Sequence, residues 1–333
     1  MSHGNPPRLV VLYGDDLPPG HEAIDSDPRL GGVDYVTADR LAEALPGAQA
    51  LFVWDLFSEA VTAAWPKADS LRWIHAATAG VDNLMFPGLV ESDVVVTNSR
   101  GVFDQPMAEY VLGLVLSFAK DLAFSRDLQR DRVWRHRETE RVGGRHALVI
   151  GTGPIGRAIA RQLRAVGMTV EGAGRTARAG DPDFGTVVAS AFDTGGPDLD
   201  TALPRADYVV LAAPYTPATR DLIGTRALGR MRPTARLINV ARGRIIVEDE
   251  LVDALRDGAI AGAALDVFAD EPLPGSSPLW DLPGVLVSPH MSGDVVGWRG
   301  ELVDLFADNL DRFLDGRDPR NIVDKRRGYV SGP

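Results

Sequence analysis

The chain contains no cysteine, and this absence excludes three kinds of chemistry. Disulfide bonds, thiolate nucleophiles and cysteine-ligated metals all require that residue. Long apolar runs are missing too, because no stretch approaches the roughly eighteen apolar residues of a membrane span. Residues 1–8 are polar and contain no apolar signal core. We therefore expect a cytoplasmic protein, and we predict no metal site.

Positive charge is in deficit, since 35 Lys and Arg residues stand against 46 Asp and Glu residues and give a formal net charge of −11. The surplus of negative charge repels polyanions and argues against general binding to nucleic acid or to anionic membranes. The chain has 333 residues, of which 45% are hydrophobic, and this is enough for two cores rather than one. The composition thus favours a two-domain protein that binds neither nucleic acid nor membrane.

Short β-branched runs alternate with helical patterns in two successive sets, which is typical of parallel sheets covered by helices. The first set predicts strands over residues 9–13, 33–37, 50–54, 71–75 and 94–98, with a helix over 38–45. The second set predicts strands over residues 147–150, 169–173, 208–212, 236–240, 263–267 and 285–288, with helices over 155–166 and 248–256. The predicted fold class is α/β, with two doubly wound parallel-sheet domains.

Three further segments complete the predicted organisation. A long helical stretch from about residue 106 to about 130 connects the two sets, and its proline suits a first helical turn. The tail over 295–314 carries one apolar helical face, which we expect to dock on the first domain. Residues 179–200 are rich in Gly, Asp and Pro and predict a surface excursion.

A complete glycine fingerprint, Gly151-Thr152-Gly153-Pro154-Ile155-Gly156, directly follows one predicted strand and opens a helix. In that setting the first glycine allows the turn, the second admits a pyrophosphate and the third permits close helix packing. The fingerprint therefore predicts a dinucleotide site built from Gly151, Gly153, Pro154, Ile155 and Gly156. A tight turn without a ligand is the alternative.

The next strand ends in Gly174-Arg175-Thr176, where many NAD-binding proteins place an acid for the ribose hydroxyl. A guanidinium beside a hydroxyl suits a 2′-phosphate instead, because charge-assisted hydrogen bonds are strong. The nearest acid, Glu171, lies inside the predicted strand. We therefore predict NADP(H) as the preferred cofactor, bound by Arg175 and Thr176, with NAD(H) possible and a solvated loop arginine as the alternative.

Arg242, Glu271 and His290 follow downstream with spacings of 29 and 19 residues. Arg242 follows a predicted strand, and its forked, permanent charge can hold a substrate carboxylate and polarise the adjacent carbonyl. The imidazole of His290 can donate a proton to the alkoxide that forms during reduction, because imidazole titrates near neutral pH. Glu271 can orient His290 and favour its protonated form. These residues predict the catalytic set of a 2-oxo acid reductase.

Four segments resemble the signatures of the D-isomer-specific 2-hydroxyacid dehydrogenases. They are Ala79-Gly80-Val81-Asp82, Asn239-Val240-Ala241-Arg242-Gly243, Leu265-Asp266-Val267-Phe268 leading to Glu271-Pro272, and Ser288-Pro289-His290. The resemblance spans nearly the whole chain. It implies a Rossmann cofactor domain over residues 104–293, inserted in a flavodoxin-like substrate domain over 1–103 and 294–333.

The resemblance also implies particular roles. Asp266 would meet the nicotinamide carboxamide, with a helix-capping or structural role as the alternative. Pro214 and Val240 would contact the cofactor, and the backbone of Ala79, Gly80 and Val81 would bind the substrate carboxylate. Ala212 departs from the pattern, because many relatives have a histidine there, and this bears on cofactor packing rather than on the reaction. The resemblance further implies a homodimer formed through the long connector and the arm over residues 126–145.

The sequence therefore predicts an enzyme that reduces glyoxylate, hydroxypyruvate or a similar small 2-oxo acid to the D-2-hydroxy acid with NADPH. One alternative is a dehydrogenase of the same fold acting on phosphoglycerate, formate or phosphite. Phosphoglycerate would call for extra cationic residues around residues 78–84, where no cluster is seen. The other alternative is a dinucleotide-sensing protein without catalysis, similar to a corepressor, although the presence of all three chemical residues argues against it.

Overall fold

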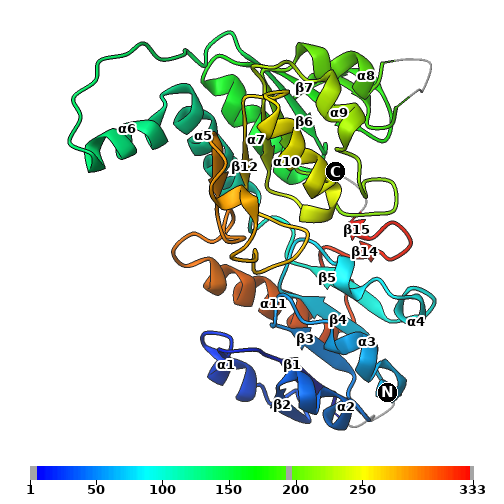
Figure 1. Cartoon of the computed structure of the whole chain (residues 1–333). Helices are drawn as coiled ribbons and strands as arrows, with labels where there is room; N and C mark the ends of the chain where they lie inside the picture. Colours follow the sequence, from blue (N-terminus) through cyan, green and yellow to red (C-terminus); the bar gives the residue numbers. More distant parts are fainter. Residues whose placement is uncertain (1–5, 193–196, 331–333) are drawn as a thin grey trace. The chain divides into compact units, whose positions relative to one another are not determined.

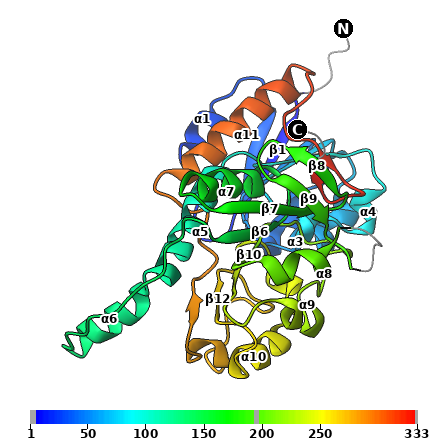
Figure 2. The same cartoon turned by 90° about the horizontal axis from the view of Figure 1, so that it is seen from above.

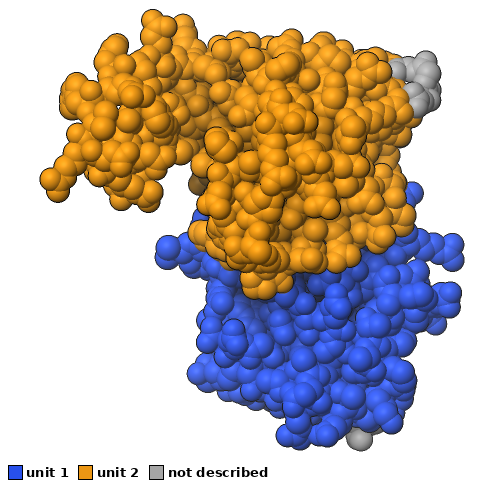
Figure 3. All heavy atoms as spheres, viewed as in Figure 1, with its two compact units in different colours: residues 1–102, 295–333 blue, residues 103–294 orange. Residues whose placement is uncertain are grey.

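The computed structural model describes residues 6–192 and 197–330. Figures 1 and 2 trace the chain in two views, and Figure 3 colours its two compact units. Unit 1 comprises Met1–Val102 and Val295–Pro333, and unit 2 comprises Phe103–Asp294. These boundaries lie one residue from the predicted domain boundaries. Within the described residues, no helix combines the length and the apolar character that a membrane crossing requires.

Unit 1 is built on a five-stranded parallel sheet with the order β2-β1-β3-β4-β5. The inner strands are buried along almost their whole length because helices cover both faces, as is usual for parallel sheets. The strands are β1 (Arg8–Leu12), β2 (Gly32–Val36), β3 (Ala50–Val53), β4 (Trp73–Ala76) and β5 (Val95–Asn98). The helices are α1 (His21–Asp25), α2 (Leu41–Ala44), α3 (Ala60–Ala64), α4 (Pro87–Val90) and α11 (Trp298–Leu314). A short hairpin of β14 (Val323–Asp324) and β15 (Tyr329–Val330) completes the unit.

The C-terminal helix α11 packs on the sheet of unit 1. Leu302 and Phe306 are fully buried, and the Phe306 ring stacks on Phe52 of β3 at 3.8 Å between centroids. Trp73 of β4 lies parallel to the same ring at 5.6 Å. The prediction that the apolar face of the tail docks on the first domain is therefore confirmed.

His75 of β4 is buried under α11. Its Nδ1 lies 2.8 Å from the Thr97 hydroxyl and 3.5 Å from the Asn309 amide, and its ring lies 5.6 Å from that of Phe306. Burial lowers the pKa of His75 to about 3, because the site cannot solvate a charged imidazole. The histidine is therefore neutral in the folded unit at any pH near neutrality.

This burial makes the stability of unit 1 depend on pH. Between its ordinary pKa of 6.5 and its lowered value, His75 binds a proton only after unfolding. The free energy of unfolding should therefore fall by about 1.4 kcal/mol for each pH unit below roughly 6.5. Urea titrations between about pH 7 and pH 5, followed by tryptophan fluorescence, would measure this slope. The dependence of the unfolding free energy on pH should be weaker in the H75Q variant, because glutamine does not titrate. The same dependence in H75Q as in the parent protein would show that His75 is not its source.

Unit 2 contains an eight-stranded sheet with the order β13-β12-β11-β10-β6-β7-β9-β8. Its strands are β6 (His146–Ile150), β7 (Thr169–Gly174), β8 (Arg178–Asp181), β9 (Gly185–Ala189), β10 (Tyr208–Leu211), β11 (Arg236–Asn239), β12 (Gly262–Leu265) and β13 (Val285–Val287). Its helices are α5 (Asp104–Ala119), α6 (Leu122–Arg130), α7 (Pro154–Ala165), α8 (Leu199–Ala202), α9 (Thr225–Arg230) and α10 (Glu248–Arg256). The predicted α/β class with two mainly parallel sheets is confirmed.

The stretch predicted to be helical from about residue 106 to about 130 is helical, but it is divided into two helices. The chain forms α5 and α6, and Asp121 between them adopts a left-handed conformation with φ 52°. The side chain of Arg137 holds this break, since it donates to the carboxylate and to the carbonyl of Asp121, each at 2.7 Å. Helix α6 consequently extends away from the sheet of unit 2, as Figures 1 and 2 show.

The surface excursion predicted over residues 179–200 needs a similar correction. Its first part forms the β8–β9 hairpin, and β9 joins the sheet beside β7 in parallel orientation. Strand β8 pairs with β9 in antiparallel orientation, so the sheet is not parallel throughout. Buried ion pairs and the core residues Phe184, Val187 and Val188 stabilise this hairpin. Residues 193–196 of the predicted excursion lie outside the described residues.

Candidate active site

The predicted chemical residues follow neighbouring strands of one sheet. Strands β6, β10, β11, β12 and β13 are parallel and adjacent, so their carboxyl ends share one edge. Strands β7, β8 and β9 lie on one side of β6, and the chain then returns to β10 on the other side. The region between β6 and β10 is therefore the switch point where open α/β sheets bind ligands. The sheet topology therefore places the fingerprint and the chemical residues at one edge of unit 2.

The glycine fingerprint forms the turn between β6 and α7. Gly151 has φ 117°, and a Cβ on it would lie 2.4 Å from the carbonyl of Ala212. A Cβ on Gly156 would lie 1.9 Å from the Gly151 carbonyl oxygen, whereas a Cβ on Gly153 would meet open space. Pro154 begins α7, and no described side chain caps that end. The turn therefore has the close packing and the open helix amino end that a pyrophosphate requires.

Arg175 and Thr176 are exposed directly after β7. Glu171 lies within β7, is 8% exposed, and accepts from one guanidinium nitrogen of Arg205 at 2.7 and 2.9 Å. The expectation that this acid is withdrawn into the strand is confirmed. The turn thus presents a cation where an NAD-binding turn would present an acid.

Arg242 is held by its own strand and by the neighbouring loop. Asn239, at the end of β11, donates to the Arg242 carbonyl at 3.0 Å and accepts from the Ala241 amide at 3.0 Å. A Cβ on Gly243 would lie 1.8 Å from the Phe268 carbonyl carbon, so only glycine allows the two loops to meet here. This contact brings the Arg242 loop against the loop that leads to Glu271.

Glu271 and His290 form a direct pair. His290 Nδ1 lies 2.7 Å from Glu271 Oε2, and the Phe268 amide donates to Oε1 at 2.8 Å. Burial alone would raise the pKa of the Glu271 carboxyl, but the hydrogen bonds from His290 and Phe268 and the charges of His290 and Arg242 hold its pKa below the ordinary value. Glu271 is therefore a carboxylate at neutral pH. It holds the His290 ring so that Nδ1 faces the carboxylate.

Asp266 fixes the loop that carries His290. Its side chain is fully buried and accepts from the hydroxyl of Ser288 and from the amides of Met291 and Ser292 at 2.6 to 3.0 Å. Its carbonyl accepts from the His290 amide at 2.8 Å. His290 has φ 52°, a conformation that costs of the order of 1–3 kcal/mol for a residue other than glycine. Asp266 thus offsets strain at His290.

The remaining predicted residues lie where strands end. Val240 is buried after β11, and Pro214 is exposed after β10, where its carbonyl accepts from Thr219 at 2.7 Å. In unit 1, Ala79, Gly80 and Val81 follow β4. Asn98 donates to the Ala79 carbonyl at 2.6 Å, and Thr78 donates to that of Gly80. That loop is therefore held by side chains at the carboxyl edge of its own sheet.

Comparison with known proteins identifies the family. The model of the D-isomer specific 2-hydroxyacid dehydrogenase NAD binding domain matches residues 112–292. A glyoxylate reductase from Thermococcus gammatolerans is 32% identical over 276 residues, which cover 80% of this chain and 80% of the relative. The chain therefore belongs to the D-isomer specific 2-hydroxyacid dehydrogenase family, as its motifs predicted. It is an NAD(P)-dependent oxidoreductase of 2-oxo and 2-hydroxy acids.

Solved structures agree over nearly the whole chain. A family member from Aeromonas salmonicida has a TM-score of 0.80 and 32% identity, with coverage of 96% of this chain and 99% of that one. An NADPH-dependent glyoxylate/hydroxypyruvate reductase from Sinorhizobium meliloti, in complex with NADP and sulfate, has a TM-score of 0.78 and 27% identity, with coverage of 97% and 100%. The prediction of a nicotinamide dinucleotide cofactor is confirmed.

Proposed function

We propose that this protein reduces a small 2-oxo acid, such as glyoxylate or hydroxypyruvate, to the D-2-hydroxy acid with NADPH. The single observation that carries the proposal is the His290–Glu271 pair at 2.7 Å, in the same unit as Arg242 and the glycine fingerprint. A proton donor, an orienting carboxylate and a carboxylate anchor are the groups that this reduction requires. The relatives named as glyoxylate reductases support the choice of substrate.

Each residue has one part in the proposed mechanism. Arg242 binds the substrate carboxylate and polarises the 2-oxo group through its charge. A nicotinamide cofactor, when bound at this edge of unit 2, would supply the hydride. His290 donates the proton from its Nε2 to the oxygen, because Nδ1 faces Glu271. Glu271 stabilises the imidazolium before transfer and keeps the ring oriented afterwards, since its low pKa leaves it charged.

The other predicted site residues bind the cofactor or position the substrate. We propose that the amino end of α7 and the turn over residues 151–156 bind the pyrophosphate, and that Val240, Pro214 and Asp266 line the nicotinamide side. The loop of Ala79, Gly80 and Val81 would add backbone donors to the substrate carboxylate. In this proposal unit 2 is the cofactor domain and unit 1 is the substrate domain.

The choice of NADPH rests on Arg175, Thr176 and the engagement of Glu171 with Arg205. The R175D variant should lower the preference for NADPH over NADH by about 10–100-fold, because a cation beside the 2′-phosphate becomes an anion. Steady-state kinetics with both cofactors would measure the ratio of kcat/KM values. R220Q, which changes an exposed arginine near Tyr215, is the control and should leave that ratio unchanged. An unchanged ratio in R175D would make the NADPH assignment wrong.

A substrate panel tests the proposal against its alternatives. NADPH consumption would be followed with glyoxylate, hydroxypyruvate, pyruvate and a phenyl-substituted 2-oxo acid, and NAD(P)+ reduction with phosphoglycerate, formate and phosphite. We expect turnover of the first two compounds at the highest kcat/KM. Turnover of phosphoglycerate, formate or phosphite alone would favour the second enzyme class. Dinucleotide binding without any turnover would favour a sensing protein.

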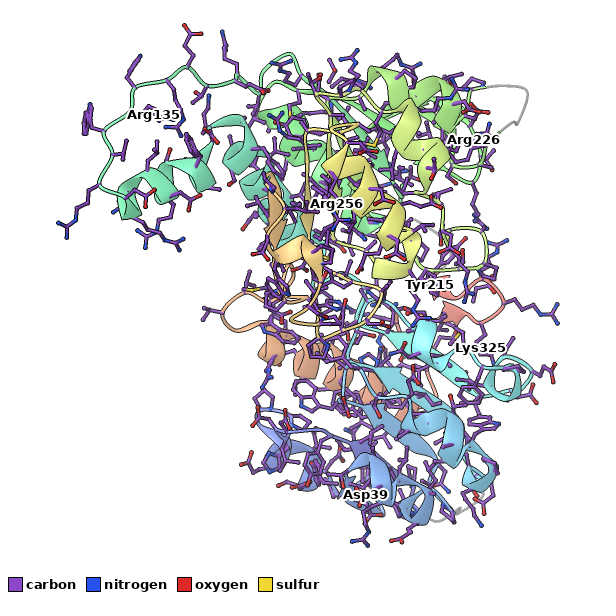
Figure 4. All side chains as sticks on the ribbon, viewed as in Figure 1. Asp39, Arg135, Tyr215, Arg226, Arg256 and Lys325 are labelled. Atoms are coloured by element: carbon purple, nitrogen blue, oxygen red, sulfur yellow. The ribbon has the colours of Figure 1, made fainter. Side chains whose placement is uncertain are left out.

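We also propose a homodimer formed through α6 and the arm that follows it. This segment exposes Leu122, Phe124, Val133 and Trp134, and the Trp134 side chain is almost fully exposed. Arg135, labelled in Figure 4, lies over the Phe124 ring at 5.8 Å. Such a set of apolar side chains on a projecting segment is typical of a protein interface.

The W134D variant should shift the protein from dimer to monomer, because it places a charge in the proposed interface. Gel filtration with light scattering at several protein concentrations would measure the mass. W280D, which changes an exposed tryptophan outside the arm, is the control and should remain dimeric. A monomeric parent protein would contradict the proposed role of the arm.

A further inference from the structure

Asp181, at the end of β8, joins two segments of the cofactor unit. Its carboxylate accepts from both terminal nitrogens of Arg157 at 3.0 Å, and from Nε and one terminal nitrogen of Arg178 at 3.1 and 2.8 Å. The amides of Asp183 and Phe184 donate to the same carboxylate at 3.1 and 3.3 Å. The Asp181 side chain is only 2% exposed. It is therefore a buried anchor and not a surface ion pair.

Both arginines that Asp181 holds belong to segments that we assign to cofactor binding. Arg157 directly follows Gly156 in the first turn of α7. Arg178 lies two residues after Thr176, and one of its terminal nitrogens is 3.5 Å from the Thr176 carbonyl. The two segments also touch, since a Cβ on Gly174 would lie 2.8 Å from the Thr152 hydroxyl oxygen. A single carboxylate thus ties the pyrophosphate turn to the turn that carries Arg175.

We propose that Asp181 is a positioning residue that sets the spacing between the pyrophosphate site and the 2′-phosphate site, and so determines the preference for NADPH. This inference rests on the proposed use of NADPH. Two phosphate groups on one rigid ligand are bound together only when their two sites are correctly spaced. Without the Asp181 charge, Arg157 and Arg178 would repel each other, and the turn with Arg175 and Thr176 would lose its tether to α7.

The charges around the anchor suit this role. Arg157 and Arg178 both contact it, and Asp183 accepts from Arg157 at 2.8 Å and from Arg161 at 3.3 Å. Asp183 makes a comparable contact with α7 from the same hairpin, but among the described residues its side chain has no hydrogen bond or ion pair with the turn after β7. It therefore offers a matched control, because its loss weakens the hairpin without releasing Arg178.

The test measures binding of two cofactor fragments to the full-length protein by calorimetry. One fragment, 2′,5′-ADP, carries the 2′-phosphate, and the other, 5′-ADP, does not. The parent protein should bind 2′,5′-ADP more tightly. D181N should weaken binding of 2′,5′-ADP by about tenfold and that of 5′-ADP by less than about twofold. D183N should leave the ratio of the two dissociation constants at the parent value.

Each other outcome is decisive. Equal weakening of both fragments in D181N would show a structural role only, and unchanged or tighter binding of 2′,5′-ADP would overturn the inference. Should D181N fail to fold, D181E would be used, because it retains the charge at an altered spacing. D181E should show the same selective weakening of 2′,5′-ADP binding, and D181E without that weakening would equally overturn the inference. A parent protein that binds both fragments alike would instead refute the proposed NADPH preference itself.

Discussion

Replacing His290 by glutamine is expected to lower kcat for 2-oxo acid reduction by about 10²–10⁴-fold, the usual contribution of a general acid. In this variant the proton must come from water, because glutamine has no imidazole that Glu271 can orient and keep protonated, as it does for His290 at 2.7 Å in the parent protein. Binding of the dinucleotide should change little, because the predicted pyrophosphate turn belongs to β6 and α7. Steady-state kinetics and calorimetry would measure the two effects separately.

H146Q is the matched control for this experiment. His146 begins β6, so it lies at the amino edge of the sheet, and it contacts Thr169 and Glu171 rather than any predicted catalytic residue. Its kcat should stay within about twofold of the parent value, as expected for a substitution away from the site. A kcat in H290Q equal to that in H146Q would exclude His290 as the proton donor.

Replacing Arg242 by glutamine is expected to lower kcat/KM by about 10²–10³-fold, the range seen when a preorganised donor to the reacting group is removed. KM for the 2-oxo acid should rise as well, because the substrate carboxylate loses its charged partner. The kcat/KM of R242K should lie between those of the parent protein and R242Q, since lysine keeps the positive charge but lacks the forked guanidinium group. Kinetics over a range of glyoxylate concentrations would give both constants.

R244Q is the matched control for Arg242. Arg244 lies two residues further along, is exposed, and donates to the Ala269 carbonyl at 3.2 Å. Its loss should leave KM unchanged. If R242Q kept the KM of the parent and lost only kcat, Arg242 would not anchor the substrate carboxylate, and the proposed division of roles would need revision.

The edge of unit 2 could be predicted because each chemical residue follows a strand of the same parallel sheet. Arg242, Asp266 and His290 come directly after apolar strands, and parallel strands end on one edge. The α11 helix could be assigned to unit 1 for a related reason, since its apolar face needs a partner. Periodicity and topology are enough for predictions of this kind.

The β8–β9 hairpin could not be predicted, because its stability comes from contacts distant in sequence. Asp181 reaches Arg157, which lies 24 residues earlier, and nothing in the Gly-, Asp- and Pro-rich composition of the segment indicates that pair. The break at Asp121 depends in the same way on Arg137, whose guanidinium returns from the arm. Local propensity continues a helix through residue 121, and the tertiary contact overrides it.

The supporting contacts of the site were also missed. Asn239 was part of a predicted motif, yet its bonds to Ala241 and Arg242 follow from the turn after β11 and not from the motif. The predicted contact of Asp266 with the nicotinamide stays a prediction, and the bonds of its carboxylate to Ser288, Met291 and Ser292 were not foreseen. The residue type was informative at these positions, but the partner depended on loop geometry that one sequence does not contain.

The central claim is tested most directly by the reaction with hydroxypyruvate. The purified protein would be given NADPH and hydroxypyruvate, and the product would be quantified and its configuration determined by chiral chromatography. We predict one D-glycerate for each NADPH consumed, and loss of this product with H290Q. Formation of L-glycerate, or no consumption of NADPH with any 2-oxo acid of the panel, would contradict the account.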